Sequence, residues 1–528
     1  MKEKKVLNRA KIVMYVLGGV FTLVSLLLVI NSGGYDRLAY PVNTDEPTSK
    51  EQNSKFSFDT EQSDIIPGNI LDRNGVVLCD FSTYAVSSKA RYIDNYIYSP
   101  LFEVMFSRRD LCEGLIRKYY DVLRDSSESN LRGNDITLTI DHELQKRVYD
   151  ILSNHLKKSE DNSEEKRASA LVLDVDTGEM LACVDFPTFD ARDPVSQKQH
   201  FFYSRNDHIW PGSTFKVMTS VMLLENGDDE TLFSDQDITL DGKTIGNWYT
   251  GLGREDYNEN RRINYFAALE RSSNDFFTRA MLEINNAGSK MTDIANRVGI
   301  GKELELDFGS IASSWDLNRA DKYTFASTGY GQGEVRISST HNLMISAAII
   351  NGGKVIEPHM IKSITDCFGQ EKNLDDVSRK YDIAGLTSDH KTYTLTDDSE
   401  VADKIHAAMI NNNNAYLISN TEKPWVGAKT GTAEIGMEGE IKVIWIISNA
   451  EINGHKYAVV INQYPFYGEI NSGSLKEPMN DIYTAIEEIF HDGEEISYSN
   501  ENIFDYLGDI RSRSLEEPLD NSNDEQEE

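Results

Sequence analysis

The sequence predicts a chain of the α+β class, with an antiparallel sheet flanked by helices, a smaller mixed region before it and one N-terminal transmembrane helix. Three observations lead to this prediction. Strand-like runs stand at both ends of residues 161–495, and a mostly helical stretch of more than 200 residues separates them. Alternating and helical segments fill residues 64–160, and an uncharged apolar run lies near the first residue. Strands at both ends with helices between them are typical of one sheet closed by both ends of a domain.

The N-terminus has the pattern of a membrane anchor. Residues 1–11 contain five basic residues and one acid, and residues 12–30 follow as 19 residues without a charge. A helix of that length spans about 28 Å, close to the thickness of the hydrocarbon core of a bilayer. The basic flank predicts a cytoplasmic tail and an extracytoplasmic remainder. A cleaved signal peptide is the alternative, but its apolar core is shorter and ends at a small-residue site, whereas NSGGYDR follows here.

Residues 31–63 are polar and lack apolar periodicity, so we expect a linker there. The next segment, 64–160, predicts a separate N-terminal domain. Two strand-like runs surround a turn at Arg73-Asn74-Gly75, and a helical stretch covers 101–123. Alternation over 136–140 then changes into helical spacing. The charged, apolar-poor run 154–167 predicts the boundary with the following domain.

The domain 161–495 opens with two strand-like runs on either side of Asp176-Thr177-Gly178, which is a hairpin signal. Three more strands are expected over 426–434, 441–450 and 455–465, followed by a helix over 478–490. The apolar stripe of this last helix consists of Met479, Ile482, Ile486 and Ile489. The final residues, 496–528, are rich in Asp and Glu, and we expect an acidic, disordered tail there.

Charge and cysteine content exclude some classes of protein. The chain has 53 basic and 86 acidic residues, a net charge of -33, which argues against general binding of nucleic acid. The ten histidines do not cluster, and the four cysteines show no C-x-x-C spacing. We therefore predict no metal site and no cofactor, and small buried or free thiols at the cysteines. These cysteines are Cys79, Cys112, Cys183 and Cys367.

Three short motifs lie in one order within 161–495. They are S-T-F-K from Ser213 to Lys216, S-S-N from Ser272 to Asn274, and K-T-G-T from Lys429 to Thr432. The pattern S-x-x-K also occurs at Ser163 and Ser388 in polar, loop-like stretches, so that motif alone is compatible with an ordinary helix start. The ordered set of three is the specific signal.

The residue types in these motifs suit acyl transfer. With a helix beginning at about Ser213, the side chains of Ser213 and Lys216 share one face and can touch. A hydroxyl beside an amine can be a nucleophile beside its own base. The following run VMTSVMLL predicts a buried helix, and burial together with Lys429 would lower the proton affinity of Lys216. A neutral amine can take the serine proton. Ser272 can pass that proton to a leaving amine, and Asn274 can donate to and accept from a peptide.

The third motif suits recognition of a substrate. In a strand, Thr430 and Thr432 face the same side, and two hydroxyls on one edge suit a terminal carboxylate. Gly431 between them allows another backbone to approach closely.

With their surroundings, these motifs resemble the class B penicillin-binding proteins, the monofunctional transpeptidases. The similar stretches are WPGSTFKVMTSVMLL, ALERSSNDFF, STGYGQGEVRIS and GAKTGTAE, with PGNILDRNGVVL and GNDITLTIDHELQ nearer the N-terminus. The resemblance runs, with gaps, from about residue 65 to residue 490. Two features differ from the family, since Pro67-Gly68 stands where it usually has Arg-Gly and the region after Glu434 lacks its usual aromatic run.

The resemblance implies a transpeptidase (penicillin-binding) domain over 161–495 on a pedestal of the dimerisation type over 64–160. It also implies an acyl-enzyme at Ser213, formed with stem peptides ending in D-Ala-D-Ala or with β-lactams. The N–H groups of Ser213 and Thr432 would form the oxyanion hole, and Gly329–Gly333 would be a wall of the cleft. A separate polytopic membrane glycosyltransferase is the implied partner, because no glycosyltransferase motif lies between Tyr35 and the first motif.

Two alternative functions stay open at this point. One is a β-lactamase or β-lactam sensor with the same three motifs, and the other is a non-catalytic scaffold of a wall-synthesis complex. The intact Ser213, Lys216 and Lys429 argue against the scaffold. The motifs do not distinguish elongation, division and sporulation, or transpeptidase from D,D-carboxypeptidase action.

Overall fold

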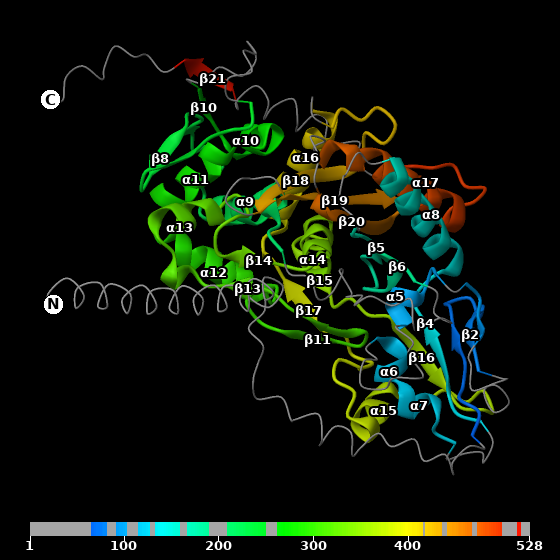
Figure 1. Cartoon of the computed structure of the whole chain (residues 1–528). Coiled ribbons are helices and arrows are strands. Elements are labelled where there is room, and N and C mark those ends of the chain that lie inside the picture. The colour runs from blue at the N-terminus through cyan, green and yellow to red at the C-terminus, as the bar shows by residue number, and fades with distance from the viewer. Residues whose placement is uncertain are drawn as a thin grey trace, which may run out of the picture. The chain divides into compact units, whose positions relative to one another are not determined.

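In the computed structural model, a five-stranded antiparallel sheet organises the larger part of the chain (Figure 1). The strand order is β18-β19-β20-β5-β6. Two strands come from the start of the predicted domain and three from its end, which confirms the predicted antiparallel sheet. The strands are β5 (Ala168–Asp174), β6 (Met180–Phe186), β18 (Gly427–Ile435), β19 (Ile441–Ile452) and β20 (His455–Phe466).

The structure describes most of the chain after residue 64. The described ranges are 65–81, 91–94, 96–102, 114–126, 132–158, 166–189, 209–249, 261–415, 418–435, 441–466, 472–498 and 515–518. All of them belong to one compact unit that begins at Gln62.

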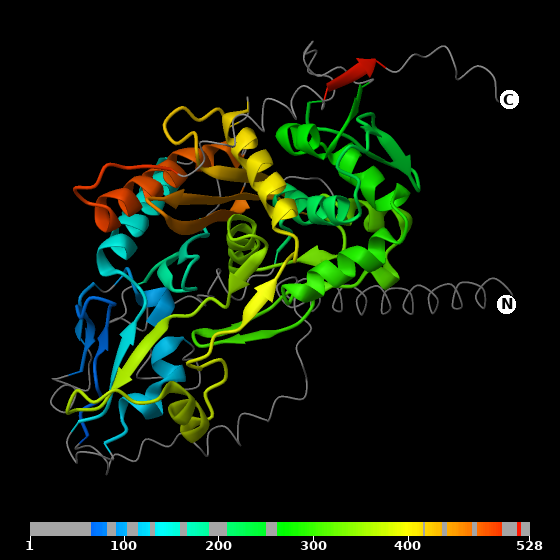
Figure 2. The ribbon, with the colours of Figure 1, turned by 180° about the vertical axis from the view of Figure 1, so that it is seen from behind.

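Two helices, α8 (His142–Lys158) and α17 (Lys476–Phe490), lie side by side on one face of this sheet (Figures 1 and 2). The apolar stripes of both helices are buried in one core with the side chains on this face of the sheet. The stripe of α17 is the predicted one, with Met479, Ile482 and Ile486 fully buried and Ile489 partly buried. Helix α8 falls within the predicted pedestal segment 64–160, yet it packs on the sheet of the following domain.

The other face of the sheet is covered by α14 (Ser339–Ile350) and α16 (Ser399–Asn414). Every residue of α14 from Ser339 to Ile349 is buried, which fits a helix enclosed in a core. Beyond them lies a helical group that appears green in Figure 1 and packs around α9. Its helices are α9 (Lys216–Glu225), α10 (Tyr265–Arg271), α11 (Asn274–Glu283), α12 (Ala287–Arg297) and α13 (Lys322–Thr328).

Short strand pairs connect these helices, which the sequence predicted only as a mostly helical stretch. Two-residue to three-residue strands gain little from packing, so their alternation is too short to recognise. The pairs are β8 (Ile238–Leu240) with β9 (Lys243–Ile245), β11 (Leu304–Leu306) with β12 (Gly309–Ile311), β13 (Ser314–Trp315) with β14 (Val335–Arg336), and β15 (Lys354–Ile356) with β17 (Thr392–Thr394).

A second, mixed five-stranded sheet forms the core of the N-terminal region, in the order β16-β4-β1-β2-β3. Strand β1 pairs parallel with β4, and the other pairs are antiparallel. The edge strand β16 comes from far along the chain and lies beside β4 in both views (Figures 1 and 2). The strands are β1 (Ile70–Leu71), β2 (Val77–Asp80), β3 (Arg91–Tyr92), β4 (Asp135–Leu138) and β16 (Ile361–Thr365).

Short helices accompany the second sheet. The predicted helical stretch 101–123 contains three of them in its described part, and residues 103–113 lie outside it. They are α5 (Ser99–Phe102), α6 (Leu115–Lys118) and α7 (Tyr120–Leu123), with α15 (Leu374–Tyr381) packed against α7. The later chain therefore contributes both a strand and a helix to the N-terminal region.

The predicted membrane anchor and the predicted disordered tail lie at the two ends of the chain. In the described ranges, no helix is long and apolar enough to cross a membrane, and the predicted anchor 12–30 lies outside those ranges. Near the C-terminus, β21 (Leu515–Pro518) pairs antiparallel with β10 (Arg261–Ile263), which also pairs with β7 (Phe233–Ser234). The predicted disordered tail covers residues 496–528, and within it residues 515–518 form this strand, which pairs with a distant strand edge.

Candidate active site

The first motif lies in a tight turn that leads into a buried helix. Gly212–Phe215 forms a 3-10 turn, and α9 follows from Lys216, so Ser213 sits one turn before the α-helix proper. Such turns are common at helix N-termini, where backbone N–H groups point outward without helical partners. Ser213 is half-buried, while Thr214, Phe215 and all of α9 up to Leu224 are buried. The predicted helix start at about Ser213 and the predicted burial of Lys216 therefore agree with the structure.

The amine of Lys216 contacts the second motif. Its Nζ lies 2.6 Å from the carbonyl oxygen of Ser272, 3.2 Å from Ser272 Oγ and 2.8 Å from Asn274 Oδ1. In the described chain no hydrogen bond joins Lys216 to Ser213, although their spacing predicted that the two side chains could touch. Lys216 is fully buried, and the rings of Phe277 and Tyr330 flank its amine at 5.8 and 6.0 Å.

These contacts fit a neutral amine. Burial lowers the pKa of Lys216 well below its usual range, and the charge of Lys429 lowers it further. Asn274 donates from Nδ2 to the carbonyl of Gly246 at 3.0 Å, which fixes its Oδ1 toward Lys216. A neutral amine can then donate to Asn274 Oδ1 and the Ser272 carbonyl and accept from the Ser272 hydroxyl.

The second motif is held by a sharp turn between two helices. Ser272 ends α10 in the left-handed conformation, with φ 55°, and Ser273 caps the start of α11 by accepting from the N–H of Phe276. Ser273 also donates to the carboxylate of Asp235, which accepts from Tyr249 OH and Asn247 Nδ2 as well. This buried cluster fixes the loop on which Ser272 and Asn274 are presented.

The third motif brings a second buried lysine to Ser272. Lys429 Nζ donates to Ser272 Oγ and to the carbonyl of Thr430, both at 2.9 Å. Burial lowers the pKa of Lys429 to about 7. Ser272 Oγ thus lies between the amines of Lys216 and Lys429, and a proton can pass from one to the other through a single hydroxyl.

Strand β18 runs directly against the serine turn. A side chain at Gly431 would lie 2.7 Å from the carbonyl oxygen of Pro211 and 3.1 Å from the N of Thr214, so only glycine permits this approach. Gly212, with φ 55°, meets the carbonyl of Thr432 in the same way. The backbone at Ser213 and Thr432, predicted to form the oxyanion hole, is therefore close together.

The two threonines differ in their surroundings. Thr430 is buried, with 8 % of its surface exposed. Thr432 is half-buried, and its hydroxyl lies 3.2 Å from Ser472 Oγ. Ser472 belongs to a short 3-10 turn, Ser472–Leu475, before α17. Both residues lie in β18 and are two positions apart, so strand alternation puts their side chains on the same face.

The glycine-rich segment Gly329–Gly333 adjoins the same turn. Gly212 donates its N–H to the carbonyl of Gly331 at 2.9 Å, and a side chain at Gly331 would lie 1.9 Å from the carbonyl oxygen of Gly212. This places the segment beside the turn that contains Ser213, and its role as a wall of a cleft stays a prediction.

Several residues of the site carried no signal in the sequence. Asp235, Asn247 and Tyr249 lie in a loop region without periodicity, and their contact with Ser273 is made only by folding. Ser273 itself could have been recognised, since a serine before a helical run is a typical N-cap. Ser472 had no local signal.

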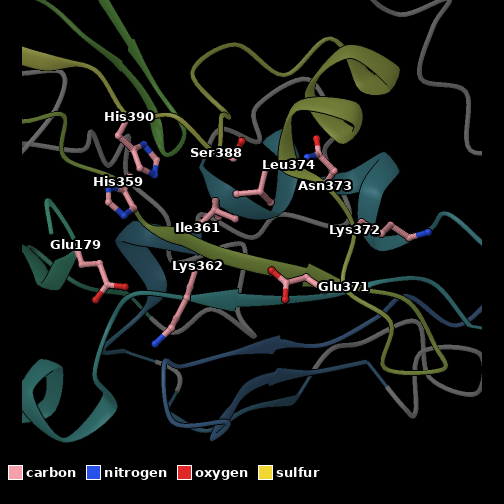
Figure 3. Close-up of a pocket in the computed structure, with 10 residues that line it drawn as sticks. All are labelled: Glu179, His359, Ile361, Lys362, Glu371, Lys372, Asn373, Leu374, Ser388 and His390. Atoms are coloured by element: carbon pink, nitrogen blue, oxygen red, sulfur yellow. The ribbon is translucent and has the colours of Figure 1, made fainter.

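A pocket of about 270 Å³ contains none of the motif residues (Figure 3). It lies beside β16, and Glu179, Lys362 and Glu371 are among its lining residues. The rings of His359 and His390 stack there with centroids 3.6 Å apart. Burial and the neighbouring His359 lower the pKa of His390 to about 4, so both rings are neutral near pH 7.

Comparison with known proteins identifies the family. The family described as the penicillin binding protein transpeptidase domain matches residues 168–483, which include all three motifs. The chain belongs to the penicillin-binding protein transpeptidase family. This confirms the resemblance to class B penicillin-binding proteins that the motifs indicated.

Individual relatives are more distant. The chain is 26% identical over 250 residues to penicillin-binding protein 3 of Bacillus subtilis, covering 44% of this chain and 35% of that protein. It is 26% identical over 201 residues to the peptidoglycan D,D-transpeptidase FtsI of Escherichia coli, covering 37% and 32%. The chain thus spans about a third of the length of the curated relatives it matches.

The fold also has solved counterparts. Penicillin-binding protein A from M. tuberculosis, in a penicillin G acyl-enzyme complex, superposes with a TM-score of 0.65 at 19% identity, covering 79% of this chain and 99% of that one. The apo-form of penicillin-binding protein 3 from the same organism gives 0.63 at 18% identity, covering 86% and 98%. At this identity the likeness concerns the fold.

Proposed function

We propose that the protein is a membrane-anchored peptidoglycan D,D-transpeptidase of class B type that forms an acyl-enzyme at Ser213 and is acylated by penicillin. One observation supports this most directly. Two buried lysines, Lys216 and Lys429, meet at Ser272 beside the turn that presents Ser213. Membership of the penicillin-binding protein family and a relative named as a peptidoglycan D,D-transpeptidase also support it.

In the proposed reaction, Ser213 Oγ attacks the carbonyl carbon of the penultimate D-Ala of a stem peptide, and Lys216 takes the serine proton. The developing oxyanion accepts from the N–H groups of Ser213 and Thr432. The C–N bond to the terminal D-Ala then breaks, and the leaving amine takes a proton through Ser272. An amine from a neighbouring peptidoglycan strand then attacks the ester, forms the new amide and releases Ser213.

Substrate binding involves the remaining motif residues in this proposal. The hydroxyls of Thr430 and Thr432 bind the terminal carboxylate, Gly431 allows the strand to approach the serine turn, and Asn274 contacts the peptide backbone. With a pKa of about 7, Lys429 is partly charged at neutral pH and can attract the carboxylate through its positive form.

We also propose that residues 12–30 anchor the chain in the cell membrane, with the N-terminus inside and the catalytic domain outside. The uncharged run and its basic flank support this. Protease added to intact protoplasts should then digest the chain after Tyr35, and full protection of the catalytic domain would contradict the topology. A polytopic membrane glycosyltransferase is the proposed partner, by family resemblance.

The decisive experiment is labelling of the full-length protein with a fluorescent penicillin, followed by mass mapping of the adduct. We expect one adduct on the peptide that contains Ser213, stable over hours, and none in Ser213→Ala. Rapid turnover of the penicillin would instead indicate a β-lactamase. Absence of any adduct in a folded protein would favour a non-catalytic scaffold.

A further inference from the structure

A carboxylic acid is enclosed in the core directly behind the second motif. Asp275 follows Asn274 in the first turn of α11, and its side chain is fully buried. Within the described part of the chain, neither of its carboxyl oxygens has a hydrogen-bond partner. The other buried carboxylate near this motif is Asp235, which follows β7 and accepts from three side chains. Buried carboxylates are normally paired or hydrogen-bonded, so Asp275 is an exception that needs a reason.

The surroundings of Asp275 favour its neutral form. Burial is the largest cause that raises its pKa, to about 8, and the negative charges of Asp235 and Asp237 add to it. The positive charge of Arg279, one turn along α11, opposes the shift, and the amine of Lys216 from α9 would oppose it when protonated. Burial raises the pKa of the phenol of Tyr330, which follows α13, and negative charge on Asp275 raises it further. Among the residues that the structure describes, no cation lies within hydrogen-bond distance of this carboxyl, so an ionised Asp275 would be a buried charge without a direct partner there.

The position of Asp275 links its charge to the reaction. The same short segment contains Ser272 and Asn274, whose side chains hold the amine of Lys216. Since the side chain is fully buried, hydration of an ionised Asp275 would require this first turn of α11 to move. Such a movement would withdraw Asn274 from Lys216, since Asn274 and Asp275 are adjacent in the chain.

We propose that Asp275 is a positioning residue whose protonated, neutral carboxyl keeps the second motif seated against Lys216, and whose ionisation releases that motif and stops acylation. This inference rests on the proposed function. It assigns a role in the pH dependence of acylation to a residue outside the three motifs.

The test compares Asp275→Asn with the wild type in full-length protein. Asparagine keeps the shape and cannot ionise. Between pH 7.5 and pH 9 a carboxyl with a pKa of about 8 changes from mostly protonated to mostly ionised, so the wild-type acylation rate should fall by up to about tenfold relative to the rate of Asp275→Asn. Taking the ratio of the two pH profiles removes the titration of Lys429, which both proteins share.

Thr278→Val is the matched control. Thr278 lies three residues further along the same face of α11, is fully buried, and has a hydroxyl without a hydrogen-bond partner. Its substitution changes packing and polarity in the same place without removing a titrating group. We expect this variant to keep the wild-type fall in rate at high pH, and an equal loss of that fall in Thr278→Val would overturn the proposal.

An infrared difference spectrum provides a readout that does not depend on activity. Wild type minus Asp275→Asn should show the C=O stretch of a protonated carboxyl at pH 7, and this band should vanish above pH 9. Absence of the band, or identical pH profiles for the two proteins, would refute the role of Asp275. If the wild type takes up no penicillin at any pH while the band is present, the proposed function fails and the protonation of Asp275 stands.

Discussion

Replacement of Lys216 tests the central step, transfer of the Ser213 proton to a neutral amine. The amine is fully buried, its pKa lies well below the usual range, and its neighbours are two carbonyl oxygens and the Ser272 hydroxyl. Lys216→Met keeps a similar volume and removes the base. Loss of a positioned general base typically costs two to four powers of ten in rate, or roughly 3–5 kcal/mol in the barrier.

Lys216→Arg separates the two roles that a lysine could have here. A guanidinium does not lose its proton in proteins, so arginine supplies positive charge without a base. If charge alone were needed, Lys216→Arg would keep part of the activity that Lys216→Met loses. We expect no rescue, and we expect a lower melting temperature for arginine, because no carboxylate bonds to this buried position.

The assay is the second-order rate of covalent labelling by a fluorescent penicillin at pH 7.5. Ser213→Ala sets the background, and thermal unfolding identifies variants that fail to fold. A folded Lys216→Met that acylates within tenfold of the wild type would exclude Lys216 as the base. The pH dependence gives a further check, since the wild-type rate should fall as pH drops and Lys216 gains a proton.

Three further predictions follow from single contacts. Thr432→Val should slow acylation about tenfold to a hundredfold, as for one hydrogen bond to a charged group; an unchanged rate would exclude the hydroxyl from carboxylate binding. Ser273→Ala removes an N-cap and a hydrogen bond to the Asp235 carboxylate, so it should lower the free energy of unfolding by about 2–4 kcal/mol in urea titrations, whereas a loss below 1 kcal/mol would contradict this. The pKa of His390 is about 4 in the folded chain, and an unfolded histidine takes up its proton from about pH 6.5. Stability should therefore fall as pH drops from about 6.5 to 4, and less steeply in His390→Gln, with melting temperature as the measure.

The sequence by itself determined the features that depend on short-range pattern. Strand alternation and helical spacing predicted the five-stranded sheet and the apolar stripe of α17, because these periods express which side of an element is buried. The three motifs supplied the residues of the proposed site, and the close approach at Gly431 follows from its missing side chain. The proposed acyl-transfer chemistry rests on the residue types of these motifs.

Tertiary structure decided the pairings between distant segments. Lys216 was expected beside Ser213 from i, i+3 spacing, yet its amine bonds to Ser272 and Asn274, because the long side chain reaches the loop that folds over it. The carboxylate that holds this loop, Asp235, comes from a region without any periodic signal. Nothing local specifies such a contact.

The boundary between the two regions shows the same limit. Charge and composition indicated a break near residues 154–167, but α8 packs on the catalytic sheet and β16 completes the sheet of the N-terminal region. Strand β21 likewise joins β10 from within an acidic stretch. An unpaired strand edge or an apolar helix stripe must be covered by another segment. Only the folded chain determines which distant segment covers it.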